Sequence, residues 1–220
     1  MKLIKYAIIF SLLTTSVVNA QIIITKPYEF SAGLSAGTTF SSVTFSPKVP
    51  QTNLMGMTFG LTGRMTMAKY VGLQAELNFV QQGWKEKYDE WPELSYTRHM
   101  NYLQLPFYTH IQFGGDKVKG FINAGPQIGY LIGESTKDEL NGETPGNVNE
   151  QHSLYAEKKF EWGISGGAGI EIHTGIGYFI LEGRYLYSFG DIYNTTRADY
   201  FSKASGQTIT VKLSYLIPFK

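Results

Sequence analysis

The sequence predicts an eight-stranded, antiparallel, up-and-down transmembrane β-barrel of the all-β class, and three observations lead to this fold. Apolar and polar residues alternate over eight successive segments, as they do in strands with one face in lipid and the other in a polar lumen. Short and long connections alternate between these segments, which is typical of outer-membrane barrels. The chain also begins with the features of an export signal.

The N-terminal segment predicts a cleaved signal peptide. Two lysines lie within the first five residues, the apolar run Tyr6–Leu13 follows, and Val18 and Ala20 place small residues at the −3 and −1 positions. This run is far shorter than the roughly 20 residues of a spanning helix, which favours cleavage over a membrane anchor. We therefore expect residues 1–20 to be removed and residues 21–220 to form the barrel domain in the cell outer membrane.

Composition excludes several classes of protein. The signal peptide contains two of the 19 Lys and Arg residues and none of the 18 Asp and Glu residues, so the mature chain has a net charge of 17 − 18 = −1. This balance argues against a nucleic-acid-binding surface. The absence of cysteine excludes disulfides and thiolate metal sites. Many glycines and aromatic residues without long apolar runs suit strands that are half lipid-facing.

The first four predicted strands each have one apolar and one polar face. They cover residues 30–40, 54–68, 71–79 and 96–113, with apolar faces that include Phe30 and Leu34, Met57 and Phe59, Leu73 and Leu77, and Leu103 and Phe107. A helix over the third segment would place Leu73 and Glu76 on one face, so the pattern favours a strand. Pro106 lies within the fourth segment, and since proline removes a ladder donor, it indicates a bulge or local kink there, or simple strand curvature, which we favour.

The last four predicted strands repeat this alternation. They cover residues 119–132, 158–173, 177–189 and 207–219, with apolar faces that include Ile122 and Ile128, Trp162 and Ile164, Phe179 and Leu181, and Leu213 and Tyr215. The opposite phase of these strands carries amide, hydroxyl and charged side chains. This phase is predicted to face the lumen, because a charged group facing lipid is destabilising.

The connections sort into two kinds. Those after the second, fourth and sixth strands are short, and they cover residues 69–70, 114–118 and 174–176. Those after the first, third, fifth and seventh strands are long, and they cover residues 41–53, 84–95, 133–157 and 190–206. Barrels of the outer membrane have short periplasmic turns and long outer loops. Both ends of the barrel domain are then expected on the periplasmic side.

Seven charged residues fall in the inward phase of the predicted strands. They are Arg64, Glu76, Glu161, Glu171, Glu182, Arg184 and Lys212. An eight-stranded barrel is only wide enough for side chains to fill, and an unpaired buried charge is destabilising by several kcal/mol. We therefore predict a structural network of paired charges that fills the lumen. The alternative is a narrow path for small solutes, lined by both signs of charge.

Other candidate sites lie in the predicted outer loops. Trp84, Tyr88 and Trp91 are candidates for a partner contact, because exposed aromatic residues commonly anchor partners, although they could equally lie at the membrane interface. The four histidines lack metal-ligand spacing, and no cofactor motif is present. We therefore expect no catalytic, cofactor-binding or metal-binding residues. An enzyme acting on lipid or peptide, with His99 or His152 in its site, is the remaining alternative.

Several short motifs resemble one family. They are Asn-Tyr-Leu-Gln-Leu-Pro at residues 101–106, Leu-Glu-Gly-Arg-Tyr at 181–185 with Gly-Asp-Ile at 190–192, the glycine-rich segment 166–169, and Gln21 after the cleavage site. The chain is similar to the small outer-membrane β-barrel family of Bacteroidetes that includes PorT-like proteins. We interpret the chain as a non-enzymatic, structural or accessory envelope protein, and the resemblance to PorT-like proteins implies a role in protein secretion. The expected partners are outer-membrane lipid and other envelope proteins, and no nucleic acid or cofactor is expected.

Overall fold

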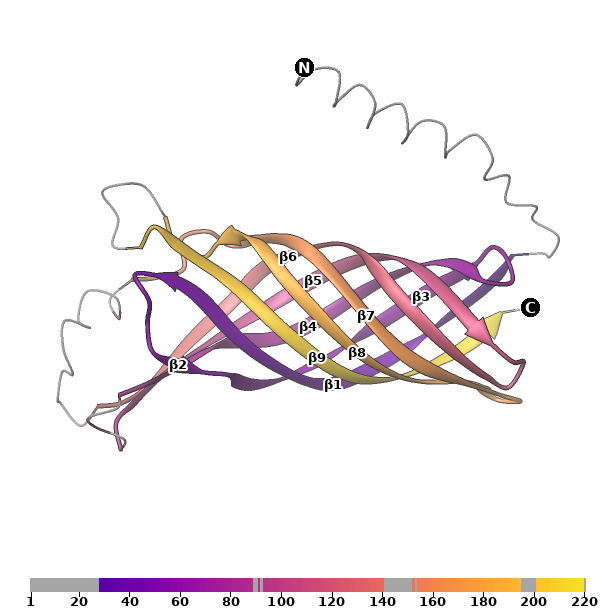
Figure 1. The fold of residues 1–220 in the computed structure, drawn as a ribbon, viewed down its shortest axis with the longest axis horizontal. Coiled ribbons are helices and arrows are strands. Elements are labelled where there is room, and N and C mark those ends of the chain that lie inside the picture. Colours follow the sequence, from indigo (N-terminus) through magenta and orange to yellow (C-terminus); the bar gives the residue numbers. More distant parts are fainter. Residues whose placement is uncertain are drawn as a thin grey trace, which may run out of the picture.

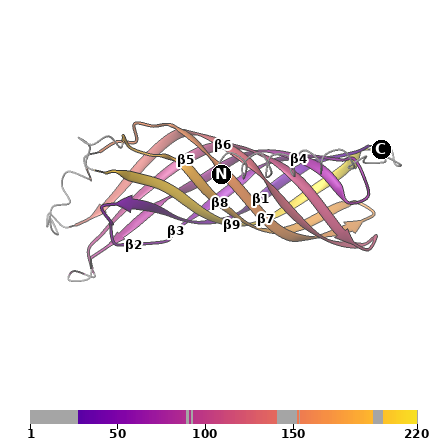
Figure 2. The ribbon, with the colours of Figure 1, turned by 45° about the horizontal axis from the view of Figure 1, so that its top comes forward.

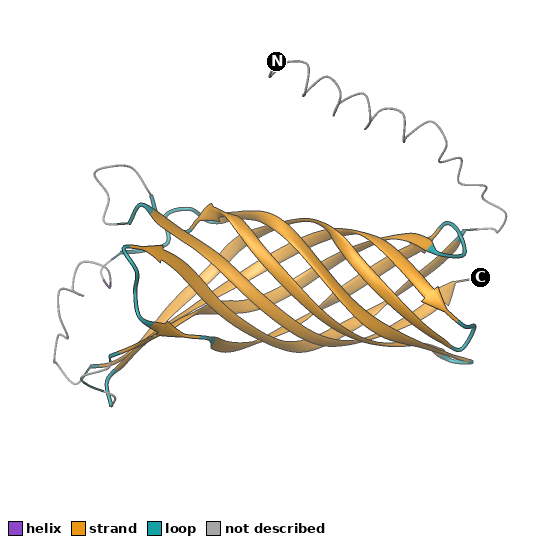
Figure 3. Ribbon diagram, in the orientation of Figure 1, coloured by secondary structure: helices purple, strands orange, loops and turns teal. Residues whose placement is uncertain are grey.

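The computed structural model describes residues 28–88, 91, 93–140, 152, 154–194 and 201–219. These residues form one closed barrel of long, tilted strands (Figures 1 and 3). The strands are β1 (Glu29–Ser46), β2 (Gln51–Thr52), β3 (Leu54–Thr66), β4 (Val71–Lys87), β5 (Ser95–Gly114), β6 (Val118–Glu139), β7 (Phe160–Thr174), β8 (Gly177–Asp191) and β9 (Lys203–Phe219). The predicted signal peptide lies outside the described residues.

Antiparallel pairing between neighbours runs around the whole barrel. The order is β4-β3-β1-β9-β8-β7-β6-β5, and the pairing of β4 with β5 closes the ring. The two-residue strand β2 pairs only with the end of β4, so eight strands make the barrel wall. The predicted eight-stranded, up-and-down barrel is therefore confirmed. The turned view in Figure 2 shows the same strands crossing the barrel axis obliquely.

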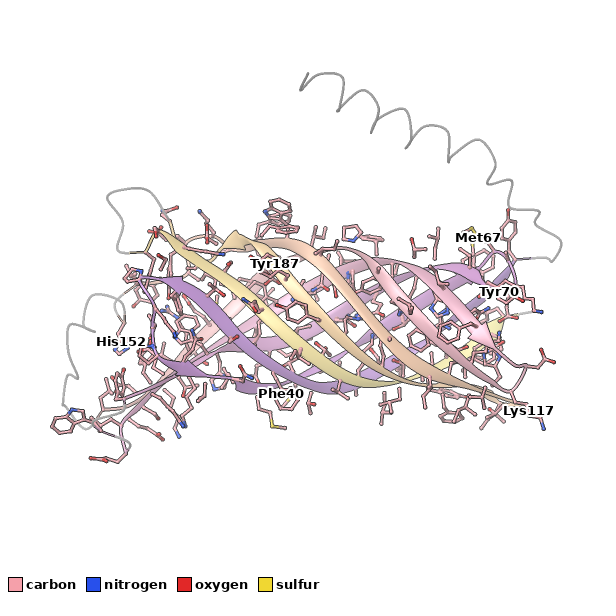
Figure 4. All side chains as sticks on the ribbon, viewed as in Figure 1. Phe40, Met67, Tyr70, Lys117, His152 and Tyr187 are labelled. Carbon is pink, nitrogen blue, oxygen red and sulfur yellow. The ribbon has the colours of Figure 1, made fainter. Side chains whose placement is uncertain are left out.

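Period-two alternation determines which side chains point outward. In β4, Leu77 is 39% exposed, whereas the neighbouring Glu76 is 3% exposed. Figure 4 shows side chains projecting from both faces of the wall. Apolar side chains remain on the outer surface because the surrounding solvent is hydrocarbon rather than water. Among the described residues, no helix has the length and apolar character needed to cross a membrane.

Short turns gather at one end of the barrel, together with both ends of the described chain. Phe30 of β1 lies opposite Phe219 of β9 there. Gly114 and Gly177, in the β5–β6 and β7–β8 turns, have φ angles of 123° and 147°, a region that side-chain-bearing residues rarely adopt. Glycine at these positions therefore allows the tight turns. This is the end that faces the periplasm in barrels of this class.

At the opposite end, the strands are longer than the sequence pattern predicts. β1, β4 and β6 continue to Ser46, Lys87 and Glu139, and β9 begins at Lys203. The connections between strands are therefore shorter than the predicted ones, which cover residues 41–53, 84–95, 133–157 and 190–206. Beyond the bilayer the outer surface meets water, so polarity inverts. Val43, Phe45 and Trp84 are buried inside this end of the barrel, whereas Lys87 and Lys137 are exposed. A search for strands with an apolar outer face stops where this inversion begins.

The strand register shows no bulge at Pro106. Pro106 lies opposite Gln127 of β6 in regular register, and the register shift between these strands falls at Asn101/Tyr102. On the β4 side, the register is the same before and after the proline, but the pairs directly opposite it are absent. The missing amide donor of proline thus interrupts the ladder locally without displacing the strand.

Candidate functional site

A four-residue ion network crosses the middle of the lumen. Arg184 of β8 donates from Nη1 and Nη2 to the two carboxylate oxygens of Glu76 on β4, each at 2.9 Å. Lys212 of β9 donates to Glu76 Oε2 at 2.7 Å. Arg184 also donates to Glu182 at 2.9 Å, and Lys212 Nζ lies 3.8 Å from that carboxylate. All four side chains are buried, and their two positive and two negative charges balance.

Strand register and small residues bring this network together. Glu182 and Lys212 lie directly opposite each other on β8 and β9. A Cβ atom on Gly37 would lie 2.7 Å from the Lys212 Cβ, and one on Gly167 would lie 3.1 Å from the Arg184 Cβ. Glycine on the inner face therefore leaves the space that the two long cations occupy. The Arg184 guanidinium also lies 4.4 Å from the centre of the Tyr108 ring.

A second ion pair lies nearer the short-turn end. Arg64 of β3 pairs with Glu171 of β7, and its Nε donates to Gln74 Oε1 at 2.9 Å. His173 contacts the other oxygen of Glu171, and its ring stacks on Tyr178 at 3.8 Å. Glu171 is thus held from two sides. This pair links β3 to β7 across the lumen.

Glu161 is the exception among the predicted lumen charges. Its carboxylate accepts hydrogen bonds from Ser188 at 2.7 Å, Gln104 at 2.8 Å and Gln82 at 3.0 Å. Within the described part of the chain, no cation lies at ion-pair distance from it. The structure places all seven predicted residues on the inner face. Six of them form ion pairs: Arg64 with Glu171, and Glu76, Glu182, Arg184 and Lys212 with one another. Glu161 is bound by neutral donors instead.

An apolar cluster fills the barrel at the long-strand end. Its members are Val43, Phe45, Val49, Trp84, Met100, Tyr102, Leu131, Ala156, Ile192, Tyr193, Phe201 and Ala204, which we call the outer plug. Trp84 packs edge-on against Phe45, with ring centres 5.1 Å apart. Phe45 in turn contacts Phe201 at 4.8 Å. The plug connects β1, β4, β5 and β6 with the segments around β9. This end of the barrel is therefore filled by packed apolar side chains, as the core of a small domain is.

One buried cation is held within the outer plug. Arg98 of β5 donates from Nη1 to the Tyr193 hydroxyl at 2.9 Å and from Nη2 to Glu134 at 3.0 Å. Its guanidinium lies 5.8 Å from the ring of Trp84. Burial raises the pKa of Tyr193, so its hydroxyl stays neutral and can accept this bond. Sequence reasoning missed this group, because Trp84 was assigned to a loop and Arg98 was not placed in the lumen phase.

The three aromatic residues proposed as a partner contact have different surroundings. Trp84 is 3% exposed and lies inside the plug, so its placement differs from the expected exposed loop. Tyr88 is partly buried and donates to Glu86 at 3.0 Å. Trp91 is 41% exposed. Of the three, Trp91 presents the most accessible ring, and Trp84 has no surface to offer a partner.

His152 also contacts Glu86, at the outer end of β4. Its Nε2 lies 3.0 Å from Glu86 Oε2, and its ring stacks on Tyr96 at 3.7 Å. Figure 4 labels His152 at the end opposite Tyr70 and Lys117. The described residues contain no group of three or more His, Cys, Asp or Glu placed to hold a metal ion.

Two cavities inside the described part of the lumen are very small. One cavity of about 20 Å³ lies beside Arg184 and Lys212, and another of about 10 Å³ lies between Glu161 and the outer plug. A single water requires roughly 10–15 Å³ on this measure. These two cavities therefore accommodate water at most.

The profile of the outer membrane protein beta-barrel domain family matches residues 19–194. The chain therefore belongs to this family, and it is an outer-membrane β-barrel protein.

Solved structures with a similar fold include Ail, the attachment invasion locus protein of Yersinia pestis, with 14% identity, a TM-score of 0.44, and coverage of 85% of this chain and 98% of that one. Neisserial surface protein A has 11% identity and a TM-score of 0.41, covering 86% and 99%. The N-terminal β-barrel domain of Pseudomonas aeruginosa OprF has 10% identity and a TM-score of 0.37, covering 85% and 97%. No curated protein matches the chain.

Proposed function

We propose that this protein is a non-enzymatic, non-conducting outer-membrane barrel that serves as a structural or accessory component of the cell envelope. The observation that supports this most is the filling of the lumen at two levels. The Glu76–Arg184–Lys212–Glu182 network spans the middle, and the outer plug fills the outer end. A side-chain-filled barrel of eight strands is suited to anchoring and contact rather than to transport.

The finer role follows from the sequence resemblance. The segment 101–106 lies in β5 and the segment 181–185 in β8. Their likeness to PorT-like proteins of Bacteroidetes supports a place in a protein secretion machine. In this proposal, the signal peptide is cleaved after Ala20, and the partners are outer-membrane lipid and other envelope proteins.

The surroundings of the two histidines of the enzyme alternative favour the non-enzymatic role. His152 faces Glu86 and Tyr96, and Nδ1 of His99 is buried without a hydrogen-bond partner. In the portion of the chain described, neither histidine has a serine hydroxyl at hydrogen-bond distance. A general base activates a nucleophile from within that distance. The proposed role therefore assigns no catalytic residue.

The unmodified barrel is expected to give no stable conductance in planar lipid bilayers. The charge network and the outer plug each obstruct the lumen, and the cavities between them hold water at most. The triple variant Glu76→Ala, Arg184→Ala and Trp84→Ala removes side chains from both levels, and we expect discrete current steps from it if it folds. Glu161→Gln is the matched control in the lumen, and it should give no current steps. Reproducible open steps from the unmodified protein would refute the non-conducting role and favour the narrow channel.

Partner capture by the purified barrel is expected to depend on Trp91. A hot-spot aromatic residue contributes about 2 kcal/mol or more to binding, so Trp91→Ala should weaken capture of envelope proteins by roughly 30-fold. Quantitative pull-down from solubilised envelopes measures this. Trp162, a 51% exposed tryptophan in the lipid-facing phase of β7, is the matched control. Equal losses for Trp91→Ala and Trp162→Ala would indicate a membrane-interface role for Trp91 instead.

A further inference from the structure

A polar cavity opens at the short-turn end of the barrel, outside the two levels that fill the lumen. It has a volume of about 150 Å³ and lies between the β3–β4 and β5–β6 turns and the ends of β7 and β8. Arg64 and Glu171 contribute to its lining, as do Lys69 and Lys119. Figure 4 labels Met67 and Tyr70, from the β3–β4 turn region, at this end.

The guanidinium of Arg64 is incompletely used. Its Nε donates to Gln74 and its Nη1 pairs with Glu171, whereas the described residues provide no hydrogen-bond partner for Nη2. Nη2 is not among the buried side-chain atoms that lack a partner, and Arg64 is one of the residues that line the cavity. The Arg64 side chain is only 3% exposed, so its position is held firmly by the barrel wall.

Two lysines of the lining also lack an ionic partner within the described ranges. Lys119 Nζ reaches only Gln112 Oε1, at 3.4 Å, and Lys69 Nζ lies 5.2 Å from the Tyr70 ring. Neither ammonium group is within 4 Å of a described carboxylate, and both can therefore donate hydrogen bonds to a ligand.

The carboxylates that line the same cavity are mostly occupied. Glu171 is bound by Arg64 and His173, and Glu29 accepts a hydrogen bond from the Tyr178 hydroxyl at 2.7 Å. Asp116, in the β5–β6 turn, is the remaining acidic residue of the lining. The lining thus carries three cationic and three acidic side chains, and Arg64 is paired with Glu171. The remaining donors are Arg64 Nη2 and the ammonium groups of Lys69 and Lys119, while Glu29 accepts only from a neutral hydroxyl.

We propose that this cavity is an anion-binding site on the periplasmic side, with Arg64 Nη2, Lys69 and Lys119 as donors. Guanidinium and ammonium groups bind carboxylates and phosphates through charge-assisted hydrogen bonds. A single water requires roughly 10–15 Å³ on the measure used for the lumen cavities, so a volume of 150 Å³ is large enough to admit a terminal carboxylate or phosphate group. The group could be carried by a soluble periplasmic molecule or by a phospholipid of the inner leaflet.

Titration of the detergent-purified, full-length barrel with inorganic phosphate, and separately with acetate, tests this site by calorimetry. We expect saturable binding of at least one of these probes, weakened tenfold or more in the double variant Lys69→Gln and Lys119→Gln. Lys117→Gln is the matched control, since Lys117 lies two residues from Lys119 but does not line the cavity. Its affinity should stay within twofold at the same ionic strength. Heat-modifiable migration on gels confirms that each variant is folded.

A second arm distinguishes the two sources of the anion. In nanodiscs that contain phosphatidylglycerol, occupation of the site by a lipid headgroup should lower the apparent affinity for the soluble probe, compared with discs of phosphatidylcholine. An unchanged affinity would assign the site to soluble anions. Arg64→Lys should also weaken binding, because the planar donor is lost. Absence of saturable binding by both probes would overturn the proposal, as would an equal loss in Lys117→Gln, which would indicate nonspecific attraction.

Discussion

Glu76→Gln is expected to destabilise the barrel by about 3–5 kcal/mol, because it leaves buried cations without their main partner. The wild-type carboxylate accepts two hydrogen bonds from Arg184 and one from Lys212, and it also accepts from Gln74 and Asn78. After the change, two cations share the single carboxylate of Glu182. Chemical unfolding of the purified barrel in lipid vesicles measures the change in the free energy of unfolding.

Two comparisons separate this effect from the general loss of a polar group. Adding Lys212→Gln to Glu76→Gln returns the network to one positive and one negative charge, and it should recover part of the lost stability. A double-mutant cycle gives this coupling directly. Glu161→Gln is the matched control, because it removes a lumen carboxylate that has only neutral donors. If Glu76→Gln is no more destabilising than Glu161→Gln, the network does not stabilise the lumen as argued.

Trp84→Ala is expected to be comparably destabilising, by about 3–5 kcal/mol, since it removes a large buried side chain. Trp84 packs on Phe45, contacts the Arg98 guanidinium, and donates from Nε1 to Glu86 at 3.1 Å. Because the outer plug lies at one end of the barrel, the loss of stability should be largest at that end. Amide hydrogen exchange at the outer ends of β4 and β5 should accelerate by roughly a hundredfold or more.

Trp91→Ala provides the comparison for this second prediction. Trp91 is 41% exposed on the same connection between β4 and β5, so its replacement should change stability by less than about 0.5 kcal/mol. Trp84→Phe keeps the apolar contact with Phe45 and should fall between the two alanine variants. Equal exchange rates in Trp84→Ala and Trp91→Ala would contradict the assignment of Trp84 to a packed core.

The membrane-spanning part of the fold was predictable from the sequence because one rule holds along its whole length. Leu77 outside and Glu76 inside follow from the same alternation that places Leu181 outside and Glu182 inside. The seven inward charges followed from this phase alone. The ion-pair partners of these charges could not be predicted in this way. The pairing of Glu76 with Arg184 depends on strand tilt and on the positions of β4 and β8 across the lumen of the closed barrel.

The outer end was not predictable by that rule, although the sequence carries a signal for it. Apolar residues at positions 43, 45, 80 and 84 continue the inward phase of β1 and β4, where the lumen residues before them are polar. The rule that apolar residues face outward therefore predicts the end of a strand at these positions. Physically, it is the point at which the surrounding solvent changes from lipid to water.

The residues of the proposed anion site were not predicted from the sequence either, since Lys69 and Lys119 belong to turns and strand ends that meet only in the closed barrel.

The length of the strands has a consequence for how this protein enters the membrane. β6 has 22 residues. At a rise of about 3.3 Å per residue and a tilt near 45°, it spans about 50 Å along the barrel axis, twice the roughly 25 Å apolar band of such barrels. The polar outer tips of the hairpins must therefore cross the bilayer before the outer plug can assemble. Because the plug then adds stability only to the fully inserted state, we expect it to slow the unfolding of the barrel from the membrane.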